Sequence, residues 1–146
     1  YNEYTGREEI LCLGLASATF AALLNVTLFE GIATFFISII ASYVATKFTK
    51  ILKAGIFGTM IACFFIGITS FALTEYGYIE HSHKIIIGSI LPFLPGVAIT
   101  KSITDLVYGD YISGGTRAIE AFLAALSIGI GIGTAMDVWV KIGGRI

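Results

Sequence analysis

The chain has 146 residues, of which 56% are apolar and only 13% are charged, and its mean hydropathy is +0.89. Soluble domains carry roughly 25% charged residues, so this composition excludes an ordinary soluble domain. The formal net charge of −1 excludes the broad basic face that a nucleic-acid-binding protein needs. The sequence therefore predicts an all-α fold: a polytopic membrane helical bundle of about five transmembrane helices, forming a single integral membrane domain over residues 1–146.

The first expected span is residues 10–29, an uncharged stretch of about 20 residues that is long enough to cross a bilayer. Small residues recur along it at four-residue spacing, which lets another helix approach closely. Asn25 is the polar member of this face. Two interpretations of Asn25 remain open, namely contact with a substrate or a hydrogen bond between helices that has no role in transport.

The second and third expected spans are residues 31–46 and 54–74, and a turn at Glu30 precedes the second. Three lysines separate the two spans: Lys47, Lys50 and Lys53. Basic loops favour the cytoplasmic side, so this connection is predicted to face the cytoplasm. The loop after the third span holds His81 and His83. Two histidines without a third ligand are a weak metal signal, so we interpret them as solvated loop residues and predict no metal site.

The fourth span, residues 85–108, contains Pro92 and Pro95. Proline has no backbone N–H and clashes with the preceding turn, so a helix entering this span should break. A new helix that starts at Pro95 leaves its first N–H groups without partners at the positive end of the helix dipole. The groups expected to be free are those of Gly96, Val97 and Ala98. Transporters hold anionic substrate groups at such breaks, which makes this the predicted substrate site.

Four polar residues follow the break on one helical face: Thr100, Lys101, Thr104 and Asp105. Their four-residue spacing brings the two hydroxyls together and allows Lys101 to pair with Asp105. Charge inside a membrane is rare, which favours a functional role for Asp105 over a purely local one. The next turn is expected over residues 108–115, where three glycines give backbone freedom: Gly109, Gly114 and Gly115.

The fifth expected span is residues 116–140. Mostly small residues recur along it at four-residue spacing and should form a helix-packing seam: Arg117, Ala121, Ala125, Gly129, Gly133 and Asp137. Glu120 follows Arg117 at a spacing that allows the two to pair. That pair either couples an ion to transport or is structural, and both interpretations remain open. The candidate ion-coupling carboxylates are Asp105, Asp110 and Glu120.

One run resembles the carboxyl-terminal part of the threonine/serine exporter family, in its larger component: LPFLPGVAITKSITDLVYGDYISGGTRAIEAFLAAL, residues 91–126. In that family a Pro-Gly motif is followed by small and hydroxyl residues, an aspartate, a Gly-Asp turn, and a helix that opens with arginine and often carries a glutamate. The matching residues here are Pro95 and Gly96, Thr100, Asp105, Gly109 and Asp110, then Arg117 and Glu120.

The resemblance implies export of small hydrophilic amino acids such as threonine and serine, or of small dicarboxylates such as succinate, driven by the proton gradient. It also implies a bacterial inner-membrane location, a second membrane unit, and a soluble amino-terminal region that residues 1–146 do not include. Because five helices are few to enclose a transport path, we expect a homo-oligomer or a smaller membrane subunit as partner, besides lipid and substrate. No cofactor is implied.

The predicted mechanism places the substrate carboxylate on the N–H groups after Pro95 and its other polar groups on Thr100 and Thr104. Asp105 binds the ammonium or carries a proton. Two rival classes remain. An intramembrane aspartyl protease would need two aspartates that face each other, whereas Asp105 and Asp110 lie on one segment. A non-transporting membrane scaffold would need only the small-residue rows, and it leaves the broken fourth span unexplained.

Overall fold

The computed structural model describes residues 6–145, with side chains from residue 8 onward, and every regular element among them is a helix. The elements follow the chain in this order: α1 (Gly6–Leu23), α2 (Leu28–Leu52), α3 (Gly55–Glu75), α4 (Ser82–Ile90), the 3₁₀ helix η1 (Leu91–Phe93), α5 (Gly96–Val107) and α6 (Tyr111–Lys141). The all-α fold that the composition predicts is confirmed.

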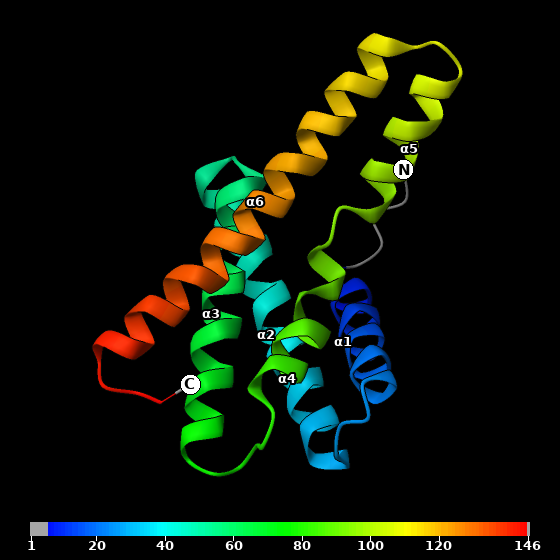
Figure 1. Cartoon of the computed structure of the whole chain (residues 1–146). Coiled ribbons are helices and arrows are strands. Elements are labelled where there is room, and N and C mark those ends of the chain that lie inside the picture. The colour runs from blue at the N-terminus through cyan, green and yellow to red at the C-terminus, as the bar shows by residue number, and fades with distance from the viewer. Residues whose placement is uncertain (1–5, 146) are drawn as a thin grey trace.

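The helices form two regions. α1 packs on α2, α2 on α3 and α3 on α6, while the short α4 lies against α1, α2 and α3 together. Figure 1 shows α5 leaving this group to pair with the first part of α6, and the tip of the pair reaches beyond the α2–α3 connection. We call α1 to α4 with the second half of α6 the bundle, and residues 96–122 the hairpin.

Three helices are long and apolar enough to cross a membrane, namely α2, α3 and α6. A fourth crossing is formed if α4–η1 and α5 are taken as one span, bent by 52° at the break between them. α1 has 18 residues and carries Glu8 and Glu9 in its first turn, which shortens its apolar length. The predicted count of about five spans is therefore approximate, and the broken fourth span is confirmed.

Several helix boundaries differ from those predicted. α1 ends at Leu23 instead of residue 29, and Glu30 lies in the first turn of α2 because Thr27 caps that helix, so the predicted turn at Glu30 was wrong. α2 continues to Leu52, so its last lysines lie on the helix, and Lys53 then ends it in the left-handed conformation at φ 53°. α6 begins at Tyr111 because the Asp110 carboxylate caps it, with Oδ1 accepting the Ser113 N–H at 3.1 Å. The turn predicted over residues 108–115 is accordingly shorter, and the Gly114–Gly115 pair is helical.

Glycines bring α3 and α6 into close contact. A Cβ placed on Gly131 would lie 2.5 Å from the Met60 carbonyl oxygen, and one on Gly67 would lie 2.6 Å from the Ala135 Cβ. The predicted row on α6 is not the one that packs on α3, because Gly129 and Gly133 meet no other part of the described chain. Two residues along a helix turn the side-chain direction by roughly 200°, so the packing row through residue 131 lies nearly opposite the predicted one.

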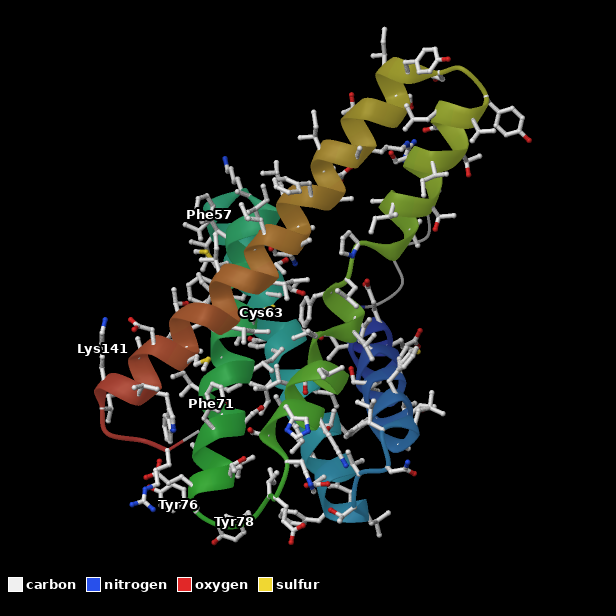
Figure 2. All side chains as sticks on the ribbon, viewed as in Figure 1. Phe57, Cys63, Phe71, Tyr76, Tyr78 and Lys141 are labelled. Atoms are coloured by element: carbon white, nitrogen blue, oxygen red, sulfur yellow. The ribbon has the colours of Figure 1, made fainter. Side chains whose placement is uncertain are left out.

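The apolar core lies among α2, α3 and α4. It contains these buried side chains: Ile37, Ala41, Ala62, Ile66, Phe71, Ile79, Ile85 and Ile86. Figure 2 labels Phe57 and Tyr76 at the two ends of α3 and Cys63 between them, on the side toward α6. Phe71 stacks on Trp139 of α6 with ring centroids 6.4 Å apart. These contacts hold α6 along α3, so only the hairpin stands apart.

Candidate functional site

The break after α4 lies where the two prolines predict it. Pro92 sits inside η1, and Pro95 is the residue immediately before the first turn of α5. Two local hydrogen bonds shape the connection, from the Leu94 N–H to the Leu91 carbonyl at 3.2 Å and from the Gly96 N–H to the Leu94 carbonyl at 2.9 Å. The chain direction changes by 52° across this connection. The amino end of α5 therefore starts at a bend rather than inside a continuous helix.

The amino end of α5 exposes fewer N–H groups than predicted. No side chain caps it, and the Gly96 N–H is already bonded to the Leu94 carbonyl. Within residues 6–145 no partner reaches the N–H groups of Val97 and Ala98. Gly96 and Val97 are exposed. Two donors at the positive end of the helix dipole thus remain for an anion, instead of three.

The hydroxyls of Thr100 and Thr104 lie on the face of α5 that is turned away from α6, and both residues are exposed. Each hydroxyl donates to the carbonyl one turn earlier, of Gly96 and Thr100 respectively, at 2.9 Å. A threonine oxygen that donates in this way still has lone pairs that can accept a hydrogen bond. Lys101 is also exposed. This outer face therefore presents two hydroxyl acceptors and one ammonium group, one to two helical turns after the free N–H groups.

Asp105 faces the opposite way, toward α6. Its Oδ2 accepts a hydrogen bond from the Ser113 hydroxyl at 3.1 Å and lies 3.0 Å from Arg117 Nε, an ion pair without hydrogen-bond alignment. The predicted pairings of Asp105 with Lys101 and of Arg117 with Glu120 are therefore not the ones the structure forms. The reason is tertiary, since the antiparallel hairpin brings α6 residues closer to Asp105 than its own helical neighbours.

A second hairpin contact comes from Ser102, which the sequence reasoning did not identify. Its buried hydroxyl donates to the Gly114 carbonyl at 2.7 Å. Gly114 also permits the close approach of α5, because a Cβ there would lie 2.7 Å from Leu106 Cγ. The only available signal was a serine two residues from each threonine, and that spacing does not reveal a backbone partner on another helix.

The remaining candidate carboxylates have separate positions. Asp110 Oδ1 accepts the Ser113 N–H and Asp105 Oδ2 accepts the Ser113 hydroxyl, so both aspartates contact Ser113, but within the described residues no hydrogen bond joins the two carboxyl groups as a catalytic dyad requires. Glu120 is exposed, and no salt bridge reaches it within the described part of the chain. It lines a groove of about 510 Å³ between α3 and α6, together with Gly55, Ile56, Thr59, Thr116, Ile119, Leu123 and Ala124.

Asn25 lies far from the break. It occupies the α1–α2 turn in the left-handed conformation at φ 53°, and its carbonyl accepts from Lys84 Nζ at 3.3 Å. Lys84 is in the first turn of α4, whereas Pro95 follows the other end, so roughly 15 Å of helix separates Asn25 from the free N–H groups. The structure does not bring Asn25 to the other predicted site residues.

The comparison with family models decides the class of the protein. The model of ThrE, the threonine/serine exporter, matches residues 2–139. The chain belongs to the threonine/serine exporter family. No curated protein and no solved structure matches it. The match to the exporter family runs from α1 into the last turns of α6, so it includes the bundle as well as the run over residues 91–126. This exporter-family chain is a multi-pass membrane protein.

Proposed function

We propose that this chain is the membrane domain of a secondary transporter that exports threonine, serine and similar small amino acids in exchange for protons across the bacterial inner membrane. The observation that carries the proposal is the bend at Pro95, in a chain of the exporter family. Uncapped N–H groups at a broken membrane helix suit a substrate carboxylate. Neither a scaffold nor a protease requires this feature.

The substrate contacts follow from the chemistry of α5. The carboxylate binds the N–H groups of Val97 and Ala98. The hydroxyl oxygens of Thr100 and Thr104 accept hydrogen bonds from polar hydrogens of the substrate. Asp105 faces α6 and lies seven residues, roughly 10 Å, beyond Ala98, so in this proposal it does not contact the amino acid but positions α5 on α6 through Arg117. An uncharged amino-acid side chain is small enough to remain between these groups.

The substrate face of α5 needs a cover. Its residues from Gly96 to Thr100 are mostly exposed, and α5 packs chiefly on α6. An alternating-access site must be closed on both sides at different times. We propose that a second copy of the chain or a smaller membrane subunit packs against this face of α5 and closes the site.

Export of small dicarboxylates such as succinate is the second candidate. The observation in its favour is Lys101, which is exposed on α5 and has no carboxylate partner among the described residues. A dicarboxylate could place one carboxylate on the free N–H groups and the other on this ammonium. An amino acid would leave Lys101 unused.

The test is uptake into inverted membrane vesicles that carry the full-length protein, because export from cells is measured as uptake in them. Labelled threonine, serine and succinate are compared with and without a proton gradient. Gradient-dependent uptake of threonine or serine supports the first candidate, and uptake of succinate alone supports the second. If none is taken up even when the smaller subunit is added, the transporter proposal fails and the scaffold interpretation stands.

A further inference from the structure

A row of buried polar side chains runs along α2. Its four members are spaced four residues apart and are each at most 3% exposed: Glu30, Thr34, Ser38 and Ser42. Spacing of four residues keeps side chains on one helical face, and twelve residues of helix rise about 18 Å. Glu30 is the one charged side chain that is buried among the residues whose exposure is described. The row therefore crosses more than half of a bilayer core of about 30 Å.

Glu30 closes the row at the end of the bundle that is remote from the hairpin. Its Oε2 accepts the Thr27 N–H at 2.9 Å, and its Oε1 accepts the His81 N–H at 3.3 Å. His81 Nδ1 lies 3.6 Å from the same Oε1, and the histidine side chain is 42% exposed against 3% for the glutamate. Tyr78, labelled at this end in Figure 2, stacks on Phe29 beside it. A half-exposed imidazole thus connects solvent with a buried carboxylate.

The Thr34 hydroxyl donates to the Glu30 carbonyl at 2.8 Å, whereas the last two hydroxyls of the row have no partner. Ser38 and Ser42 have buried Oγ atoms that make no hydrogen bond, although serines in helices commonly bond the carbonyl one turn back, as Ser17 does. The Oγ of Ser89 on α4 is buried and unpaired as well. Gly88 beside it approaches Thr34, because a Cβ there would lie 3.2 Å from Thr34 Cγ2. Buried polar atoms without protein partners are ordinarily satisfied by ordered water.

We propose that Glu30 is a proton-binding site and that Thr34, Ser38 and Ser42 line a water-filled path from it toward the cytoplasmic end of α2. A proton from outside passes His81 and protonates the Glu30 carboxylate. Glu30 then releases a proton to the hydroxyl and water chain and becomes a carboxylate again. This inference rests on the proposed antiport, in which protons enter as substrate leaves, and it places proton binding far from the substrate face of α5.

A proton fits this row better than a metal cation does. Hydroxyls that succeed one another at roughly 6 Å along a helix cannot converge on one ion, and a sodium site needs several oxygens around a single point. Each carboxylate oxygen of Glu30 also already accepts one backbone N–H, which leaves fewer lone pairs for a metal ion. The other titratable side chains between the last residue of α3 and the first turn of α4, at the same end of the bundle as Glu30, are Glu75, Tyr76, Tyr78, Glu80, His81, His83 and Lys84. His81 alone among them has a side-chain atom in ion-pair contact with Glu30.

The test separates proton coupling from substrate binding. Glu30→Gln in reconstituted full-length protein should lose proton-driven threonine accumulation while it keeps exchange of labelled for unlabelled threonine, which needs no net proton movement. Ser38→Ala should slow proton-driven accumulation with exchange unchanged. Ser127→Ala is the matched control, because Ser127 is equally buried but its hydroxyl bonds the Leu123 carbonyl. Proton-driven accumulation by Glu30→Gln at the control rate would overturn the site, and equal rates for the two serine variants would overturn the path.

A second measurement does not depend on transport. Infrared difference spectra of the purified protein in lipid, between acidic and neutral pH, should contain a protonated carboxyl component that Glu30→Gln lacks. A component that persists in the variant, or no component in the parent protein, contradicts the proton site. If the parent protein carries the component but transports nothing, the antiport proposal fails while Glu30 remains a proton-binding group.

Discussion

The hairpin and the bundle place their polar groups in opposite ways. In the hairpin, Thr100 and Thr104 are exposed, and Asp105 pairs across to α6 at a partly exposed position. In the bundle, Ser38 and Ser42 are buried and unpaired. Exposed polar groups on a membrane helix suit a ligand of several atoms, whereas buried hydroxyls without protein partners suit water or protons. The contrast suggests that substrate and coupling ion use different regions of one chain.

The largest effect expected in the hairpin comes from Asp105→Asn. Loss of the carboxylate charge removes the ion pair with Arg117 that positions α5 on α6, so transport should be lost while the protein still inserts. Asp137→Asn is the control, since it removes an exposed carboxylate whose ion pair is with Lys141 on its own helix. Uptake in vesicles measures both. Wild-type rates for Asp105→Asn would show that this ion pair is not needed to position the substrate face of α5.

The stability of the bundle should be most sensitive to added side-chain volume where α3 and α6 are in contact. Gly131→Ala puts a methyl 2.5 Å from the Met60 carbonyl oxygen, and overpacking of this kind costs about 1–3 kcal/mol. Gly129→Ala, two residues away, meets open space and should be neutral or slightly stabilising. Thermal unfolding in detergent compares the two. Equal melting temperatures would mean that α3 and α6 are not packed as closely as the structure has them.

Thr104→Val should weaken substrate binding without unfolding the hairpin. Valine keeps the shape of the side chain but cannot accept a hydrogen bond, and one lost bond corresponds to roughly a tenfold rise in KM. Thr116→Val is the matched control, because Thr116 is also exposed and donates to the carbonyl one turn earlier on α6. A KM that rises equally in both variants would indicate a general helix effect.

The smallest effect is expected for Ser102→Ala. The hydroxyl donates to the Gly114 carbonyl inside the hairpin, and a buried hydrogen bond of this kind contributes about 1 kcal/mol. Hydrogen exchange of the α5 backbone should become faster, while exchange in α2 should not change. If protection of α5 stays the same, the hairpin is held by its other contacts, such as Leu106 against Gly114.

Prediction from the sequence succeeded where the cause was local. Pro92 and Pro95 break the fourth span because proline lacks an N–H, whatever surrounds it. Prediction failed for the packing row of α6, because Gly129 and Gly131 are both small residues in an apolar stretch and the sequence does not distinguish them. Only the position of α3 selects the row that packs. The substrate assignments of Thr100, Thr104 and Asp105 stay predictions until transport is measured.

The sequence by itself determined that this protein is helical and lies in a membrane, that it belongs to the exporter family, and that its fourth span breaks at the two prolines. Hydropathy, a contiguous motif and proline chemistry are each properties of one segment, so they do not depend on packing. Only the tertiary structure decided that Asp105 pairs with Arg117 instead of Lys101, and that Glu30, in the first turn of α2, is buried against His81. Both contacts join helices whose relative position depends on packing of the whole bundle, which no spacing within one helix can specify.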